Sequence, residues 1–290
     1  MKYDSKGEKT FYFINYIILT LLGISTLFPF INLIAKSMSS NSEVISGLVT
    51  LYPKGFQLDA YKYVLSQGQF VNSFKVSLFV TIVGTIMSMI MTVMAAYPLS
   101  KPELKGRKIF LLMYIFVMLF GGGMIPNYLL IKSLGMLNTV WSLILPGMIA
   151  VFNMLIVKNF FEGLPESVEE SAKIDGASDI KILFSIVLPM AIPVIATVGL
   201  FYVVSYWNNY MNAVLYITKP TLKPLQQYLY DLVASADAIK KGGGTIDIDQ
   251  AMNLSTDTVT AATITVPIIL VYPFLQKYFV KGITIGSVKG

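Results

Sequence analysis

The sequence predicts an all-α integral membrane protein with six transmembrane helices, and three observations carry this prediction. Of the 290 residues, 55% are hydrophobic and 13% are charged, whereas soluble domains are normally about 25% charged. The apolar residues gather into six runs that are each long enough for a helix to cross a bilayer. Polar segments that hold nearly all the Lys, Arg, Asp and Glu residues separate these runs. A soluble fold is therefore excluded.

We expect one domain over residues 1–290, with spans at about 11–35, 74–100, 109–131, 139–157, 188–215 and 261–279. The first run follows a polar stretch with three lysines and resembles a signal peptide. At about 25 residues it is longer than the 7 to 15 residues of a signal core, so we expect it to stay as the first span. The polar segment 36–72 contains a turn signal at Tyr52-Pro53-Lys54-Gly55, and we expect short interfacial helices there.

The third and fourth spans contain residues that weaken a helix. Gly121, Gly122 and Gly123 lie inside the third span, and Pro146 precedes Gly147 inside the fourth. Bends of this kind are tolerated at membrane depth where protein or a water-filled path satisfies the freed backbone groups. Two interpretations stay open: a bend beside a translocation pathway, which makes Asn127 a candidate pathway residue, or a helix that packs closely through its glycines.

Several function classes are excluded by residues that the chain lacks. It has no cysteine and no histidine, which removes disulfides, imidazole catalysis and the usual zinc sites. It has no glycine-rich loop of the kind that cradles nucleotide phosphates, so we expect neither an enzyme nor a bound cofactor or metal in this chain. The apolar runs contain no Asp, Glu or Arg, and their two lysines, Lys75 and Lys277, lie at the ends of runs. This argues against an ion-coupled carrier.

The net charge of +6 indicates membrane orientation rather than nucleic-acid binding, because the basic residues lie in short loops between spans. Thirteen of the 22 Lys and Arg residues lie in the N-terminal tail, in 101–108, in 158–187 and in 277–289. Six spans place these segments on one side. We therefore expect both termini to be cytoplasmic, with 36–72 and 218–260 on the outside.

A charged segment, residues 162–187, interrupts this apolar sequence. Pro165 suits the first turn of a helix, and the carboxylates that follow it favour the positive end of the helix dipole. Gly176 suits the left-handed position that ends a helix. The segment therefore predicts two helices that are broken at Gly176. An ordinary capped loop between two spans would have the same pattern.

The order of residues in this segment is more specific. Glu170-Ser171-Ala172-Lys173-Ile174-Asp175-Gly176-Ala177, followed after eight residues by Ile186-Val187-Leu188-Pro189, resembles the "EAA" signature of permease subunits of binding-protein-dependent ABC importers. Ser171 stands where the signature has its first alanine, and both residues are small. The chain looks most similar to the carbohydrate-uptake branch that includes the maltose permeases.

This resemblance implies a type I ABC importer transmembrane domain whose segment 162–187 is a cytoplasmic coupling helix seated on an ATPase subunit. The candidate coupling residues are Glu166, Glu169, Glu170, Ser171, Ala172, Asp175, Gly176 and Ala177. The implied partners are a second permease subunit, two ATPase subunits that hold ATP and Mg, an extracytoplasmic binding protein and a sugar. The implied location is the cytoplasmic membrane of a prokaryote.

The C-terminal tail and the fifth span hold further candidates. On composition alone the tail is a frayed end, but the resemblance implies that it contacts the ATPases through Lys281, Gly282, Lys289 and Gly290. On the fifth span, Tyr202, Tyr206 and Asn209 recur at helical spacing beside Trp207 and Asn208.

Amide groups and aromatic faces of this kind bind sugars, whereas an aromatic belt at the membrane surface would give the same pattern. The resemblance favours the substrate pathway, because sugar permeases of this family carry a Trp-Asn pair on the pore side. We therefore predict a permease subunit that forms half of the path of an ATP-driven carbohydrate importer. The alternative is an ATP-independent facilitator or channel for small polar solutes.

Overall fold

The computed structural model of the chain describes residues 6–240, 258–261 and 263–264, and these residues form helices and turns without a strand. They belong to two compact units: residues 1–68 with 229–272, and residues 69–228 with 273–290. The single domain over 1–290 stays a prediction. The sixth predicted span, 261–279, and the C-terminal tail lie almost entirely outside the described residues.

The first unit begins with the long apolar helix α1, Lys6–Ser37, where the sequence predicts the first span. Two short helices follow in the polar segment, α2 at Asn41–Ile45 and α3 at Asp59–Ser66, as expected. The Asn32 side chain donates a hydrogen bond of 2.7 Å to the carbonyl of Thr50, which fixes the turn onto α1. The position of these helices at a membrane surface stays a prediction.

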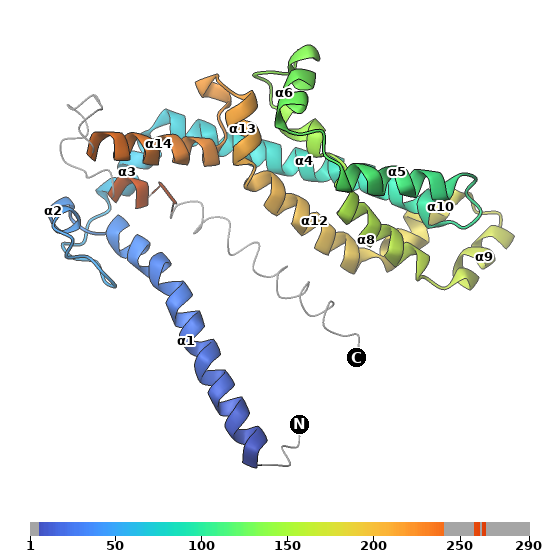
Figure 1. The fold of residues 1–290 in the computed structure, drawn as a ribbon, viewed down its shortest axis with the longest axis horizontal. Helices are drawn as coiled ribbons and strands as arrows, with labels where there is room; N and C mark the ends of the chain where they lie inside the picture. Colours follow the sequence, from blue (N-terminus) through green and yellow to red (C-terminus); the bar gives the residue numbers. More distant parts are fainter. Residues whose placement is uncertain (1–5, 241–257, 262, 265–290) are drawn as a thin grey trace. The chain divides into compact units, whose positions relative to one another are not determined.

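The second unit contains the second to fifth predicted spans (Figure 1). Its first helices are α4 at Gly68–Ser100, α5 at Arg107–Leu119, α6 at Met124–Ser133, α7 at Trp141–Ile144 with the short turn η1 at Leu145–Gly147, and α8 at Val151–Glu162. The later ones are α9 at Glu166–Ile174, α10 at Asp179–Ile182, the π turn η2 at Leu183–Val187, α11 at Leu188–Met190, α12 at Ile192–Trp207, α13 at Tyr210–Tyr216, η3 at Pro220–Leu222 and α14 at Leu225–Lys240, which runs on into the first unit.

Helices α1 and α4 are each long and apolar enough to cross a membrane, and the described residues give up to five spans if each of three bent pairs counts as one. The third span bends by 111° between α5 and α6, and the fourth by 48° between η1 and α8. The predicted bends are thus present. Within the described residues a Cβ on Gly121 would meet no atom within 4 Å, whereas one on Gly122 or Gly123 would contact a residue of α6 at 3.8 or 3.9 Å. Packing of another helix against these glycines stays a prediction.

The helix of the fifth predicted span, 188–215, is interrupted in the structure, and its bounds stay a prediction. The chain bends by 84° between Met190 and Ile192, and the helix breaks again at Asn208 and Asn209. Pro193 explains the first break, because proline has no N–H for the helical ladder and its ring crowds the carbonyl four residues earlier. The apolar run therefore predicted that this region is hydrophobic, but it did not predict where its helix breaks.

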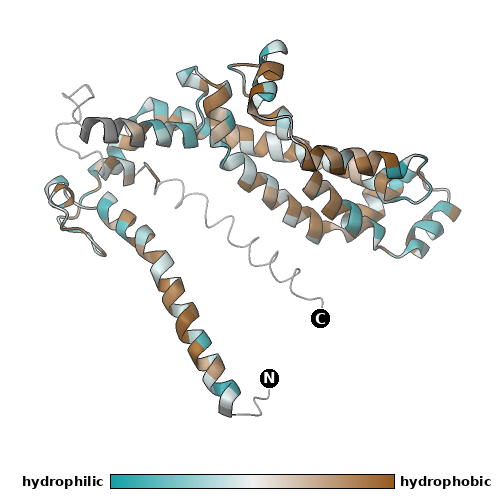
Figure 2. Cartoon of the chain, in the orientation of Figure 1, coloured by the Kyte–Doolittle hydropathy of each residue, from teal (hydrophilic) through white to brown (hydrophobic). Residues whose placement is uncertain are grey.

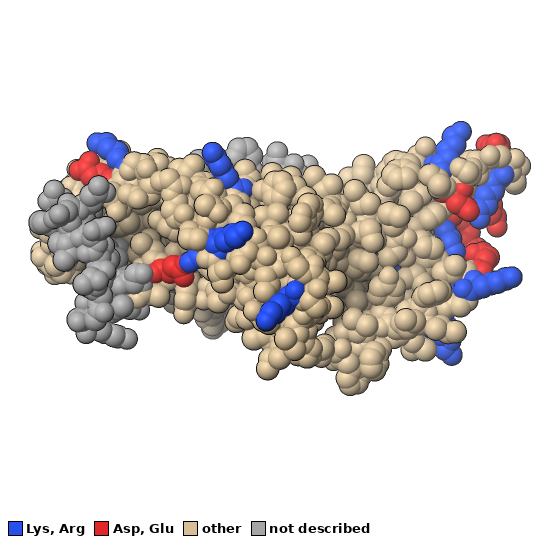
Figure 3. Space-filling model, turned by 90° about the horizontal axis from the view of Figure 1, so that it is seen from above, with Lys and Arg blue, Asp and Glu red and all other residues tan. Residues whose placement is uncertain are grey.

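Figure 2 shows that the ribbons of α5 and α12 are coloured mainly as hydrophobic residues. Large residues such as Phe116 and Leu119 on α5 are more than half exposed in the chain alone. Figure 3 shows the opposite pattern at one end of the second unit, where acidic and basic side chains gather around α9 and α10. Apolar sides and a charged end are the pattern expected of helices that cross a bilayer and emerge into water.

Candidate coupling site and pathway residues

The coupling segment is two short helices that meet at a left-handed glycine. Helix α9 starts after Pro165, and Glu166 and Glu169 lie in its first turn, where they complement the helix dipole. Gly176 has a φ of +77°, a conformation that glycine adopts without strain. The Oγ of Ser178 then caps α10 by accepting a hydrogen bond from the backbone N–H of Lys181. The predicted break at Gly176 is confirmed. We call residues 162–187 the coupling corner.

One face of α9 packs inward and the other is open. Ala172 is buried, and Glu169 and Val168 are half-buried. Among the other candidate coupling residues, Glu166, Glu170, Ser171, Asp175 and Gly176 are exposed, and Ala177 is half-buried. The structure also places two large apolar side chains on this outer surface, Ile174 at 86% exposed and Ile180 at 72%.

The sequence analysis missed Ile174 and Ile180. They lie on either side of Gly176, and neither falls on the apolar stripe formed by Leu164, Val168 and Ala172. An apolar residue off the buried stripe of an amphipathic helix was the signal that could have found Ile174. Exposed apolar side chains of this size beside small residues are typical of a surface that another protein covers.

An ion pair attaches α9 to the loop that follows α4. The Lys101 ammonium bonds to the Glu169 carboxylate, and their side chains are only 25% and 13% exposed. The same ammonium lies 4.8 Å from the centre of the Tyr97 ring, within reach of a cation–π contact. Because Tyr97 is on the last turns of α4, this ion pair connects the coupling helix directly to the longest helix of the second unit.

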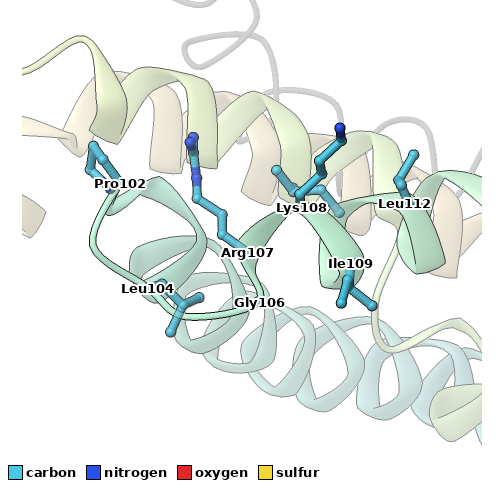
Figure 4. A pocket seen from close by; sticks show the side chains of 8 residues that line it. Pro102, Leu104, Gly106, Arg107, Lys108, Ile109 and Leu112 are labelled. Atoms are coloured by element: carbon cyan, nitrogen blue, oxygen red, sulfur yellow. The ribbon is translucent and has the colours of Figure 1, made fainter.

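A second set of charges holds the end of α8 against the same loop. The carboxylate of Glu162 accepts hydrogen bonds from Arg107 and from Lys158, which is 9% exposed. The Arg107 Nε also donates to the carbonyl of Leu99, at 2.8 Å. Figure 4 shows Arg107 and Lys108 pointing to one side of their loop while Leu104 and Ile109 lie on the other. We call the pairs Lys101–Glu169 and Arg107–Glu162–Lys158 the ionic clamp.

The sequence analysis interpreted residues 101–108 only as an orientation signal, and the clamp adds a structural role. Its partners are 68 residues apart for Lys101 and Glu169 and 55 apart for Arg107 and Glu162. No local pattern could have paired them. Among the described residues, no group of His, Cys, Asp or Glu is placed to hold a metal ion.

The tyrosines of the predicted pathway stripe lie in the interior of the second unit. Tyr202 is 2% exposed and Tyr206 is 7% exposed, and their rings stack at 6.5 Å. The Tyr202 hydroxyl pairs with Thr92 at 2.7 Å and accepts from the N–H of Ala150 at 3.0 Å. These bonds attach α12 both to α4 and to the start of α8.

Tyr206 makes the equivalent contacts one turn further on. Its hydroxyl pairs with Ser88 at 2.8 Å and donates to the carbonyl of Ile144 at 3.1 Å. Ile144 and Ala150 lie on the two sides of the break in the fourth span. The two hydroxyls therefore satisfy backbone groups near this break, which is the condition for a bent helix at membrane depth.

The remaining pathway candidates are more accessible. Trp207 is half-buried and packs edge-to-face on Phe74 at 6.2 Å, whereas Asn208 is exposed. Asn209 is half-buried and donates to the carbonyl of Leu143 at 3.3 Å. Asn127 is exposed on α6.

The structure also assigns a role to Gly84, which sequence reasoning missed. A Cβ on Gly84 would lie 2.8 Å from a carbon of the Tyr206 ring, so only glycine lets this ring reach Ser88 and Ile144. Lys281, Gly282, Lys289 and Gly290 of the tail lie outside the described residues.

The chain is similar over nearly its whole length to known transport proteins. The chain is 45% identical over 290 residues to protein LplC of Bacillus subtilis, with 99% of this chain and 98% of that protein covered. It is 44% identical to the polygalacturonan/rhamnogalacturonan transport system permease protein YtcP of Bacillus subtilis, with 95% and 96% covered.

A chain from the crystal structure of a bacterial ABC transporter that imports the acidic polysaccharide alginate superposes with a TM-score of 0.88 at 33% identity, with 96% of this chain and 100% of that chain covered. Residues 5–285 match the family described as the inner membrane component of binding-protein-dependent transport systems. The chain therefore belongs to this family of ABC importer permeases.

Proposed function

We propose that this chain forms half of the translocation path of an ATP-driven importer of sugars or oligosaccharides. Its partners are a second permease subunit, two ATPase subunits that bind ATP and Mg, and an extracytoplasmic binding protein. The family and the named transport relatives support this assignment. The observation that carries it is the coupling corner. This pair of short helices is attached to the end of α4 by the ion pair between Lys101 and Glu169.

The outer surface of the coupling corner has the composition of a docking site for an ATPase subunit. Ile174 and Ile180 supply apolar anchors, while Ser171 and Gly176 allow close approach. Glu166, Glu170 and Asp175 supply charges for basic groups on the partner. Together with Ala177 and the tail residues Lys281, Gly282, Lys289 and Gly290, these are the residues that we assign to ATPase contact. With six spans, this assignment predicts that both termini are cytoplasmic.

The ionic clamp gives the coupling corner a mechanical connection to the spans. Displacement of α9 acts on Lys101 through Glu169, and Lys101 directly follows α4. Helix α4 in turn bonds to α12 through Thr92 and Ser88. A short helix that is held by a half-buried ion pair passes motion to its neighbours better than a loose loop would, because packed elements move as units.

We assign the pathway to the accessible polar residues near the end of α12. Trp207 offers an aromatic face, and Asn208 and Asn209 offer amide groups, as does Asn127 on α6. Aromatic faces and amides together are suited to binding the rings and hydroxyls of sugars. Tyr202 and Tyr206 act as positioning residues, since their hydroxyls are used within the chain.

Substitution of Gly176 tests this proposal in the reconstituted complex. Gly176→Val forces a β-branched residue to adopt a φ of +77°, which costs about 1–3 kcal/mol of local strain and misdirects α10. Gly47→Val is the matched control, because Gly47 has a φ of +71° and open space around it, but lies outside the coupling corner. We expect Gly176→Val to insert normally and to lose sugar-stimulated ATP hydrolysis, whereas Gly47→Val keeps it. Full stimulation in Gly176→Val would mean that residues 162–187 are only a loop.

A further inference from the structure

Within residues 69–228, the carboxylates are confined to one end of the second unit. These carboxylates are Glu103, Glu162, Glu166, Glu169, Glu170, Asp175 and Asp179. They belong to the coupling corner and to the loop that it contacts, so the unit has no carboxylate in α6, α12 or α13. Figure 1 shows that α6 and α13 lie away from the end that α9 and α10 occupy. Lysines, in contrast, are present at both ends.

Three exposed lysines belong to the end without carboxylates. Lys75 lies near the start of α4, Lys132 near the end of α6, and Lys219 just before η3. Within the described residues, none of these three makes an ion pair. We call Lys75, Lys132 and Lys219 the lysine rim.

Hydrogen bonds bring the three segments of the lysine rim together. The Asn72 side chain, on the turn before Lys75, donates to the carbonyl of Thr221 at 2.6 Å. The Oδ1 of Asn138 accepts from the backbone N–H groups of Thr218 and Lys219, at 2.7 Å and 2.9 Å. Since Asn138 lies five residues after the end of α6 at Ser133, it joins the Lys132 segment to the Lys219 segment.

The turn that carries this junction is held in an uncommon conformation. Asn138 has a φ of +57° and is the non-glycine residue with positive φ among the described residues. Such residues persist where the surroundings fix them, and they concentrate at binding and switch sites. Three hydrogen bonds to its Oδ1 hold Asn138 in place, so the backbone that presents Lys219 is fixed.

We propose that the lysine rim binds the carboxylates of an acidic oligosaccharide, one built from uronate units, as this substrate enters the translocation path. The inference rests on the proposed function and names its substrate class. Lysine suits the task because an ammonium is a point charge that attracts a carboxylate without the bidentate geometry of arginine. Weak attraction at several points favours passage over trapping.

The position of these lysines also argues against the alternative that they serve only to solvate the surface. If the coupling corner is cytoplasmic, the lysine rim is on the outer side, where basic residues oppose the orientation bias that places Lys and Arg inside. A surface that only needed solubility would mix both signs of charge. A group of positive charges instead raises the local concentration of an anionic substrate.

The test uses the full complex with its binding protein in liposomes of zwitterionic lipid, and two probes of equal length, trigalacturonate and its neutral methyl ester. The variant replaces Lys75, Lys132 and Lys219 by glutamine. The control replaces Lys105 and Lys108 by glutamine, two exposed lysines at the same end as the coupling corner but outside it and outside the ionic clamp. We expect each rim lysine to contribute about 2- to 5-fold and the triple variant to lose about tenfold or more in uptake of the acid relative to the ester. High salt should reduce the same preference in the parent complex.

Unchanged relative uptake of the acid in the triple variant would overturn the proposal. If that variant only raised the binding-protein concentration needed for half-maximal ATP hydrolysis, the rim would be a docking surface for that protein, and the proposal would fail. An effect that appeared only with anionic lipid would assign the rim to headgroups and would likewise overturn the proposal. Uptake of neither probe, together with ATP-driven import of a neutral oligosaccharide, would refute the acidic substrate and leave the proposed function intact.

Discussion

The coupling corner and the break in the fourth span are both attached to α4, but by different kinds of bond. Each is an interrupted helical segment that must be held against α4. At the coupling corner, Lys101 and Glu169 do this with opposite charges. At the break, Tyr202 and Tyr206 do it with neutral hydroxyls that bond to Thr92, Ser88 and free backbone groups.

The difference follows from the surroundings of the two regions. The clamp lies at the charged end of the second unit, where its side chains keep partial access to water and the cost of desolvating an ion is small. The tyrosine hydroxyls lie among apolar helices, where an ion would cost several kcal/mol and a neutral hydrogen bond satisfies the backbone. Charge is therefore used where water reaches, and neutral bonding where it does not.

The largest expected effect comes from closing the space that Tyr206 occupies. Gly84→Val would place a side chain 2.8 Å from the Tyr206 ring and displace its hydroxyl from both Ser88 and Ile144. We expect a loss of about 3 kcal/mol in stability, from overpacking and unpaired polar groups together. The measurement is the thermal unfolding midpoint of the purified complex in detergent.

Gly121→Val is the control for this substitution, because a Cβ there meets no atom within 4 Å. It should change the midpoint much less. Equal loss in both variants would show that valine itself, rather than the contact with Tyr206, is the cause.

The next effect concerns the clamp and tests its dependence on charge. Glu169→Lys would set two ammonium groups together in a partly buried site, and Lys101→Glu would do the same with two carboxylates. We expect each variant to lose about 2 kcal/mol of local stability and most sugar-stimulated ATP hydrolysis. The double exchange should recover much of both, since it restores an opposite pair.

Lys173→Glu provides the comparison at an exposed pair, where Lys173 lies 4.0 Å from Asp179 and is 53% exposed. Its effect on stability should be below about 1 kcal/mol. If the double exchange at Lys101 and Glu169 were no better than either single variant, the ion pair would not be what holds α9.

The smallest effect is expected from removing one hydroxyl at the break. Tyr206→Phe keeps the ring but leaves the carbonyl of Ile144 without this donor, which should cost about 1–2 kcal/mol. Unlike the clamp, this bond is neutral and buried, so the loss should be the same at low and high salt. Tyr52→Phe, at a residue 63% exposed, is the control. A loss at Tyr206 that salt abolished would contradict the division between charged and neutral bonding.

The sequence alone determined the features that depend on composition or on neighbouring residues. Long apolar runs require helices in a bilayer, and the left-handed turn at Gly176 follows from residues within a few positions of it. The glycine triplet and Pro146-Gly147 likewise predicted the bends, because the loss of helical hydrogen bonds depends on the local sequence.

Only the tertiary structure decided which partners the polar side chains bond to. Helical spacing placed Tyr202 and Tyr206 on one face, but it could not say whether that face borders a pathway or another helix. Lys101 and Glu169 are 68 residues apart, so their pairing depends on how α4 and α9 pack. Periodicity specifies which side chains share a surface, whereas the partner of that surface is set by contacts between segments that are distant in the chain.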